Sequence, residues 1–366
     1  MTTNSPIRNR REILTGLAIA GGVGCIPSPL FAQASSRLRN DTDDPRRRDW
    51  RWLAGSWDVE HRRLKERLAG SNEWQSFSGK SNLWMAMDGL GTIDDNLIDL
   101  PDGRYRGAGI RAFDPNSQRW AIWWLDGRDP TDFGSPVMGS FAGDIGTFSG
   151  DDMLRDRPVK VQLRWSDIHS ARPHWEQAFS PDGGKSWETN WAMNFSRTAL
   201  TPTPFPPVEQ PAAPRDWDFL VGSWSVRHRR LKHRLVGSTE WEQFAGTLVN
   251  RPLLGGMANV GDNMMDFPAG AYRGIGLRAF DTKAGQWLSW WLDGRDPMSF
   301  TTPMRGGFAD GIATMTGKDS QDGKPVLVRV IWSRITPASA RWEQACSADN
   351  GATWETNWTS DFSRRA

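Results

Sequence analysis

One domain-sized segment occurs twice in this sequence, and this repeat limits the folds that the chain can adopt. Residues 50–197 align with residues 217–364 at a constant offset of 167, and the alignment needs no gap. The first copy ends in "WEQAFSPDGGKSWETNW" and the second in "WEQACSADNGATWETNW". Because so long a period is that of a whole domain, each copy is predicted to fold as one domain.

The segments outside the two copies complete the predicted organisation. Residues 198–216 contain six prolines, which predicts a semi-rigid linker between the domains. Residues 35–49 form a short segment before the first copy, and residues 1–34 are predicted to be an export signal.

Residues 1–34 have the features of a bacterial twin-arginine signal peptide. Arg10 and Arg11 form a basic pair, residues 13–26 are apolar, and "AQA" at residues 32–34 is typical of a cleavage site. The apolar stretch is too short and too rich in glycine to anchor the chain across a bilayer. We therefore expect a periplasmic or secreted protein without membrane insertion after cleavage. A buried N-terminal helix is the alternative.

Charge and cysteine content exclude several classes of partner. The formal net charge of +2 comes from residues 1–34, so the remaining chain is neutral and is not expected to bind nucleic acid or anionic lipid. Of the two cysteines, Cys25 lies in the signal and only Cys346 remains, which excludes an intramolecular disulfide and a cysteine metal site. Lipid attachment at Cys25 is an alternative, although Gly22 stands where a lipobox usually has leucine.

Each copy consists of short segments of strand character separated by turn sequences. "PDG" at 101–103 and "PDGG" at 181–184 are typical of hairpin turns. In the last segment, alternation places Trp187, Thr189, Trp191, Met193 and Phe195 on one face. About ten such segments in hairpin succession predict an all-β fold of two tandem up-and-down antiparallel barrels, because closure removes the sheet edges. A β-sandwich is the alternative.

Two short motifs carry a resemblance to known barrels. "WLAGSW" at 52–57 and "FLVGSW" at 219–224 resemble the Gly-x-Trp opening of lipocalin-type barrels. Together with the repeated "LDGRDP" and "WEQA" blocks, the copies resemble an uncharacterised bacterial family of domains of unknown function with calycin-like barrels. The resemblance covers both copies. It implies that the tryptophan closes the barrel base, and it implies no activity.

A third motif resembles the Asp box of sialidase propellers. Its spacing, Ser-x-Asp-x-Gly-x-(Ser/Thr)-Trp, occurs once in each copy, at Ser180–Trp187 and Ser347–Trp354. A propeller needs at least about four blades, each with its own motif, so a sialidase fold is not expected. The motif is predicted to form a hairpin turn, with Asp182 bonded to backbone N–H groups.

Strand alternation identifies candidate binding residues. If Trp57 faces the barrel interior, then Val59, His61 and Arg63 face it too. The same reasoning groups Tyr105 with Arg111 on a neighbouring strand. The complete set of predicted ligand-binding residues is His61, Arg63, Tyr105, Arg111, Trp124, Asp126 and Glu176 in the first copy, and His228, Arg230, Tyr272, Arg278, Trp291, Asp293 and Glu343 in the second.

Two functions from different classes fit a tryptophan-lined pocket with a few charged groups. The first is an exported protein that binds apolar or aromatic small molecules. The second is an enzyme, a lyase, hydratase or isomerase, with His61, Asp126 and Glu176 as acid or base and Arg63 or Arg111 holding an anion. Structural roles are the alternative: tryptophans in the core, and an ion pair within "LDGRDP" that fixes a turn.

No metal or cofactor is predicted. The sequence has no His-Glu-x-x-His motif, no Gly-x-Ser-x-Gly motif and no glycine-rich phosphate loop. A haem bound by one axial histidine, at the His61 and His228 positions, is the alternative.

Overall fold

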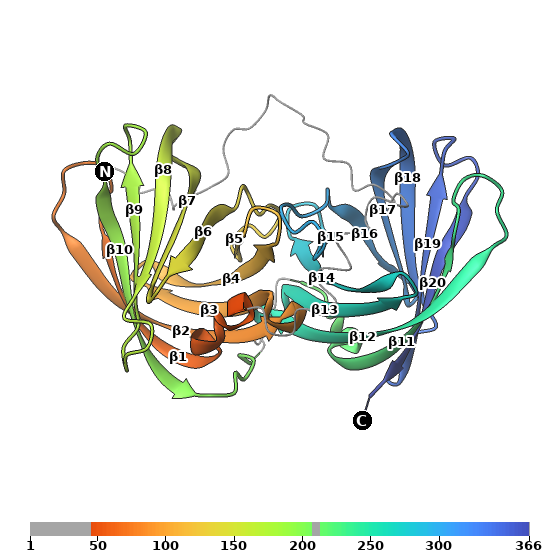
Figure 1. Ribbon diagram of the computed structural model, residues 1–366, viewed down its shortest axis with the longest axis horizontal. Coiled ribbons are helices and arrows are strands. Elements are labelled where there is room, and N and C mark those ends of the chain that lie inside the picture. The colour runs from red at the N-terminus through yellow and green to blue at the C-terminus, as the bar shows by residue number, and fades with distance from the viewer. Residues whose placement is uncertain (1–44, 207–212, 366) are drawn as a thin grey trace. The chain divides into compact units, whose positions relative to one another are not determined.

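The computed structural model describes residues 45–206 and 213–365, and it contains two closed antiparallel barrels (Figure 1). Each barrel has ten strands, and strands adjacent in sequence are adjacent in the barrel. The first strand of each barrel also pairs with the last, so every strand is hydrogen-bonded on both sides. The predicted all-β fold of two up-and-down barrels is confirmed, and the β-sandwich alternative is wrong.

The first barrel comprises β1 to β10. Its strands are β1 (Gly55–Leu64), β2 (Trp74–Ala86), β3 (Gly91–Leu100), β4 (Gly103–Asp114), β5 (Arg119–Asp126), β6 (Val137–Ala142), β7 (Ile145–Leu154), β8 (Arg157–Ser166), β9 (His174–Ser180) and β10 (Glu188–Ala199). Three short 3-10 helices belong to this barrel: η1 (Pro45–Arg48), η2 (Arg51–Leu53) and η3 (Met87–Gly89).

The second barrel comprises β11 to β20 in the same order. Its strands are β11 (Gly222–Leu231), β12 (Trp241–Leu253), β13 (Ala258–Phe267), β14 (Gly270–Asp281), β15 (Gln286–Asp293), β16 (Met304–Ala309), β17 (Ile312–Gln321), β18 (Lys324–Ser333), β19 (Ser339–Ser347) and β20 (Glu355–Arg364). Its 3-10 helices are η4 (Asp218–Leu220) and η5 (Leu254–Gly256).

A cluster of large aromatic side chains fills one end of each barrel. In the first barrel, Trp50 is fully buried and contacts the rings of Trp120, Phe148 and Trp165. In the second, Trp217 takes the same place, against Trp287 and Trp332. Large aromatic rings bury much apolar surface at little cost in side-chain entropy, so they fill the barrel end efficiently. This packing leaves the other part of each interior open.

The Gly-x-Trp motif lies at the same end, and its geometry explains the glycine. The indole of Trp57 donates to the carbonyl of Leu53 at 2.8 Å, and the Arg197 guanidinium lies 4.0 Å from the Trp57 ring centre. Gly55 has a φ of 132°, and a Cβ atom there would lie 2.6 Å from Nη1 of Arg197. A residue with a side chain fits neither this backbone conformation nor this space.

The same contacts recur in the second barrel. Arg364 lies 4.3 Å from the Trp224 ring and donates to the carbonyl of Val221 at 2.7 Å. The arginine on the last strand therefore holds the motif in place in both barrels, a role that we did not predict from the sequence.

One local expectation from the sequence is wrong. Trp187 precedes β10 and is 40% exposed, and a β-bulge between Thr189 and Trp191 breaks the predicted alternation. The bulge buries Asn190, whose side-chain oxygen accepts a hydrogen bond from Gln177 at 2.9 Å. Residues 65–73 form the loop between β1 and β2.

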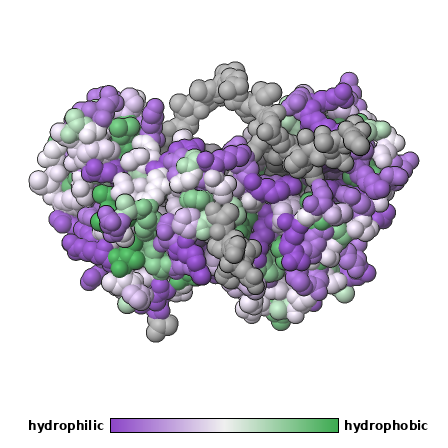
Figure 2. Space-filling model, turned by 180° about the vertical axis from the view of Figure 1, so that it is seen from behind, coloured by the Kyte–Doolittle hydropathy of each residue, from purple (hydrophilic) through white to green (hydrophobic). Residues whose placement is uncertain are grey.

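Few large hydrophobic side chains are exposed among the described residues. On the face shown in Figure 2, hydrophobic residues are scattered among charged and polar ones. The large hydrophobic side chains exposed among the described residues are Ile145, Trp187, Leu200, Val236 and Ile312. In the described parts of the chain, no helix has both the length and the apolar character needed to cross a membrane.

Candidate functional site

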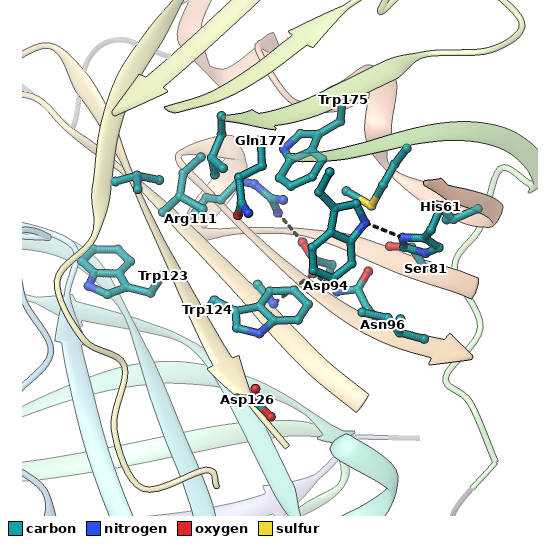
Figure 3. Close-up of a pocket in the computed structure, with 18 of the residues that line it drawn as sticks. His61, Ser81, Asp94, Asn96, Arg111, Trp123, Trp124, Asp126, Trp175 and Gln177 are labelled. Atoms are coloured by element: carbon teal, nitrogen blue, oxygen red, sulfur yellow. Dashed lines mark hydrogen bonds and ion pairs between the residues drawn. The ribbon is translucent and has the colours of Figure 1, made fainter. Parts of the chain in front are cut away.

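Each barrel encloses a cavity beside its aromatic cluster. The cavity of the first barrel has a volume of about 190 Å³ and that of the second about 290 Å³. Alternate residues of the strands point inward, so the walls combine tryptophans with a few polar and charged groups. Figure 3 shows the first cavity, with Trp123, Trp124 and Trp175 among its labelled residues.

His61 lies in the wall of the first cavity and is 3% exposed. Its ring stacks on Phe77 with the ring centres 4.9 Å apart, and its Nδ1 accepts a hydrogen bond from the Trp191 indole at 3.2 Å. Burial, with a smaller contribution from the charge of Arg63, lowers the pKa of His61 to about 4. His61 is therefore neutral near pH 7, with its proton on Nε2.

His228 has the same surroundings in the second cavity. The Trp358 indole donates to its Nδ1 at 3.3 Å, and Ser360 Oγ lies 2.8 Å from the same nitrogen. Burial lowers the pKa of His228 to about 4 as well. Both histidines thus act as neutral aromatic wall residues.

The "LDGRDP" motif forms an ion pair at the end of β5. Arg128 donates from Nε to Asp126 Oδ1 at 2.9 Å and from Nη2 to Asp126 Oδ2 at 2.5 Å. The guanidinium also lies 4.0 Å from the ring centre of Tyr105. Asp293, Arg295 and Tyr272 repeat this arrangement in the second barrel. Both carboxylate oxygens of Asp126 are occupied, which is the turn-fixing ion pair foreseen as the structural alternative.

A second ion pair lies deeper in the first cavity and includes a residue that we did not predict. Asp94, on β3, is 3% exposed and pairs with Arg111 on β4. The carboxylate also accepts hydrogen bonds from Asn96 and, at 2.9 Å, from the backbone N–H of Gly109. Figure 3 shows Asp94 between Arg111 and Asn96.

The glycines of β4 make room for these inward-pointing side chains. A Cβ atom at Gly109 would lie 2.6 Å from Oδ2 of Asp94, and one at Gly107 would overlap the ring of Trp124. Neighbouring side chains therefore occupy the space that these two glycines leave.

Most of the predicted residues line a cavity. They are His61, Tyr105, Arg111, Trp124 and Asp126 in the first barrel, and His228, Tyr272, Arg278, Trp291 and Asp293 in the second.

Glu176 and Glu343 do not line a cavity. Trp175 and Gln177 point inward, so alternation turns Glu176 to the outer face, where it lies 3.4 Å from the ring of His174. Glu343 lies between Trp342 and Gln344 in the same way, and it pairs with Arg341. Neither glutamate is positioned to act on a molecule inside the barrel.

Arg63 and Arg230 also lie outside the cavity walls, and their partners differ. Arg63 is opposite Gln75 and packs on the ring of Trp191, 5.3 Å from its centre. At the corresponding place, Arg230 is opposite Glu242 and forms an ion pair with it.

The two cavities differ at several positions related by the repeat offset. Ile122, Met193 and Asp94 of the first barrel correspond to smaller residues, Ser289, Ser360 and Gly261, in the second. These exchanges help to explain the larger second cavity. The exchange of Ser81 for Leu248 has the opposite effect, because the larger leucine side chain takes volume from the second cavity.

Several cavity residues were missed at the sequence level. They include Asp94, Asn96, Trp123, Trp175, Gln177 and Trp191 in the first barrel, and Asn263, Trp290, Gln344 and Ser360 in the second. The available signal for Asp94 was the acidic pair Asp94-Asp95 inside the strand segment "GTIDDNLIDL". Among the described residues, no group of three or more His, Cys, Asp or Glu side chains is arranged to hold a metal ion.

The fold and the two interior cavities define a protein of two tandem up-and-down β-barrels, and the two closed barrels confirm the architecture that the resemblance implied. Neither a protein-family model nor a curated protein matches the sequence.

Among the solved structures that are similar to this chain at low identity, two cover most of its length. One is a protein of unknown function from the DUF3598 family of Nostoc punctiforme, with 11% identity, a TM-score of 0.27, and coverage of 87% of this chain and 99% of that one. Another is a double mutant of the vaccine antigen transferrin binding protein B from Haemophilus parasuis, with 8% identity, a TM-score of 0.17, and coverage of 84% and 75%. Similarities this low carry no argument about function, which rests on the site alone.

Proposed function

We propose that this chain is an exported binding protein whose barrels each hold a small apolar or aromatic molecule. The observation that carries the proposal is the pair of interior cavities, each walled by tryptophans and a neutral histidine. Apolar walls with few polar groups are typical of small-molecule sites. Aromatic rings in the wall offer stacking surfaces to an aromatic ligand.

The charged groups support binding better than catalysis. A general base works best when its pKa is near the working pH, and the pKa of His61 is about 4. Both oxygens of Asp126 are bonded to Arg128, and Glu176 faces away from the cavity. None of the three groups proposed as acid or base is therefore poised for proton transfer at neutral pH.

Export is the part of the proposal that rests on residues 1–34, which lie outside the described residues. Its support is the arginine pair at residues 10 and 11 and the cleavage sequence at residues 32–34.

Filling one cavity tests the binding function. Gly276 lines the second cavity, and a Cβ atom there would make only ordinary contacts at 3.7 Å, so Gly276→Val should fold while it fills the space. We expect isothermal titration calorimetry with a panel of neutral one- and two-ring aromatic alcohols to detect binding to the unmodified protein. In Gly276→Val, the binding in the second barrel should be weakened at least about tenfold.

Gly307→Val is the matched control. Gly307 lies on β16 outside the cavity wall, and a Cβ atom there would meet no atom within 4 Å. This variant should bind as the unmodified protein does. Equal weakening in both variants, or no binding of any compound in the panel, would contradict the binding of neutral aromatic molecules in these cavities.

A further inference from the structure

We propose that the cavity of the second barrel selects ligands that carry a carboxylate, and that this carboxylate pairs with Arg278. The inference rests on the proposed binding function and specifies the chemical class of ligand in one barrel. It follows from a difference between two otherwise corresponding sites.

In the first barrel, the protein itself supplies the counter-ion. Asp94 pairs with Arg111, and Thr92 Oγ1 accepts a further hydrogen bond from Arg111 at 3.2 Å. The Arg111 guanidinium also packs on Trp50, 4.6 Å from the ring centre. The positive charge at this place is thus neutralised before any ligand enters.

In the second barrel, the corresponding arginine has no such counter-ion. Arg278 replaces Arg111, but Gly261 replaces Asp94. Arg278 Nη1 donates a hydrogen bond to a neutral oxygen, Asn259 Oδ1, at 3.3 Å. Its guanidinium packs between aromatic rings, 4.4 Å from Trp217 and 5.4 Å from Trp332. No carboxylate among the described residues forms an ion pair with Arg278.

The structure also leaves space beside Arg278. Gly261 pairs directly with Gly276 across β13 and β14, so two adjacent wall positions carry no side chain. In the first barrel, the pair at this place is Asp94 and Gly109. A Cβ atom at Gly276 would make only ordinary contacts at 3.7 Å, so this position of the wall is open toward the cavity. The place of the Asp94 side chain is taken by Leu248, whose Cδ1 lies 2.5 Å from where a Gly261 Cβ would lie. A ligand carboxylate therefore reaches Arg278 from the cavity, which Arg278 lines, and not at the position of the missing aspartate.

The balance of positive and negative side chains that line the two cavities also differs. The first cavity is lined by four cationic side chains, Arg67, Lys80, Arg111 and Arg128, and four carboxylates, Asp94, Asp126, Asp132 and Asp152. The second is lined by three cationic side chains, Arg234, Arg278 and Lys318, and by two carboxylates, Asp293 and Asp319. Asp293 is already held by Arg295, which leaves the second cavity with excess positive charge.

Arg278 stays charged in this position. Burial lowers its pKa to about 10, which is still far above neutral pH. A buried charge without a counter-ion is unfavourable, and a carboxylate that approaches it is attracted strongly because little water screens the pair. Arginine also presents paired N–H donors that match the two oxygens of a carboxylate.

The test compares ligands that differ only in charge. Benzoate and benzyl alcohol form one pair, and 2-naphthoate and 2-naphthylmethanol form another. Isothermal titration calorimetry on the unmodified protein should show one site per chain that binds the carboxylate at least about tenfold more tightly than the alcohol. The titrations are made at low ionic strength and repeated at high salt. Salt screens charges, so the electrostatic part of the binding free energy is the part that weakens at high salt.

Two variants assign the preference to Arg278. Arg278→Met keeps the aliphatic stem and should abolish the preference for the carboxylate while the alcohols still bind. The double variant Leu248→Ser with Gly261→Asp gives the second barrel the residues of the first, and it should also abolish the preference. Arg63→Gln is the control, because Arg63 forms no ion pair with a carboxylate of the described residues and lies outside the cavity walls, and it should leave the preference unchanged. Circular dichroism and thermal unfolding verify the fold of each variant.

The outcomes separate this inference from the binding function. Equal binding of alcohol and carboxylate overturns the carboxylate site and leaves the binding function standing. A preference that survives in the Leu248→Ser, Gly261→Asp variant also overturns it, even if Arg278→Met fails to fold. Absence of binding by both members of every pair overturns the carboxylate site together with the function on which it rests.

Discussion

The buried histidines show how surroundings decide the chemistry of a residue. His61 and His228 each accept a hydrogen bond from a tryptophan indole at Nδ1, and protonation of that nitrogen would break the bond. Burial in an aromatic wall acts in the same direction and lowers both pKa values to about 4. The histidines are therefore pH-sensitive elements of stability, and they do not act as acids or bases near pH 7.

The free energy of unfolding should fall as the pH drops from about 6.5 to 4. The unfolded chain binds a proton at each histidine near pH 6.5, whereas the folded chain resists protonation until about pH 4. Each histidine should therefore lower the stability by up to about 3 kcal/mol across this window, and it contributes no such loss above it.

Urea denaturation at pH 7 and pH 4.5, followed by circular dichroism, measures this effect. The double variant His61→Phe with His228→Phe should be less stable at pH 7, because the indoles lose an acceptor, but its stability should fall less on acidification. His233→Gln is the control, since His233 is exposed. An unchanged slope in the double variant would mean that other groups control the acid response.

At this scale the sequence predicted cavity residues well where alternation is regular. His61, Tyr105, Arg111, Trp124 and Asp126 line the first cavity, as strand parity indicated. Asp94 was not predicted, because its role depends on Arg111, which lies on the neighbouring strand, and pairing register is a tertiary property.

At the scale of elements, the strands and hairpins followed from local sequence, but the bulge did not. Turn sequences such as Pro101-Asp102-Gly103 fall between β3 and β4 as expected. The bulge between Thr189 and Trp191 inserts one residue against Gln177. Periodicity cannot reveal such an insertion, because the extra residue is satisfied by a partner from another strand.

The Asp box is a hairpin turn in both barrels, as its position in the repeat indicated. Asp182 accepts hydrogen bonds from the backbone N–H groups of Lys185 and Ser186 at 3.0 and 2.9 Å, and from the hydroxyl groups of Ser180 and Ser186 at 2.7 and 2.6 Å. The pKa of Asp182 lies well below its usual range, mainly because Ser186 donates two hydrogen bonds to the carboxylate. This carboxylate therefore fixes the turn between β9 and β10.

Asp182→Ala should lower the thermal unfolding temperature and leave ligand affinity unchanged. The reason is that four hydrogen bonds within the turn are lost, while no cavity residue is altered. Differential scanning calorimetry and ligand titration on the same sample measure both quantities. Asp102→Ala, in a turn between β3 and β4, is the control, and it should have a smaller effect. Loss of ligand affinity at a temperature where Asp182→Ala is folded would contradict the structural role.

At the scale of the whole molecule, each barrel is a complete fold with its own aromatic core and its own cavity. Cys346 is buried and is the one free cysteine in the described part of the chain. A protein that needs no disulfide to fold is suited to a pathway that exports folded proteins.

Replacement of both Arg10 and Arg11 by lysine should therefore make the uncleaved precursor accumulate in the cytoplasm of a bacterial host with a twin-arginine pathway. Cell fractionation and immunoblotting measure precursor and processed protein, and the unmodified chain in a host that lacks the pathway is the control. Processing that continues in that host would show that the chain uses another route.

The exchange of Asp94 for Gly261 has an evolutionary consequence. Codons for aspartate and glycine can differ at one base, but a Cβ atom at Gly261 would lie 2.5 Å from Cδ1 of Leu248, so an internal counter-ion in the second barrel also requires a smaller residue at position 248. Under the proposed carboxylate selectivity, changes at these two positions alter the ligand preference of one barrel while the sister barrel keeps its own. The tandem arrangement thus lets one chain broaden its range of ligands through changes at two positions.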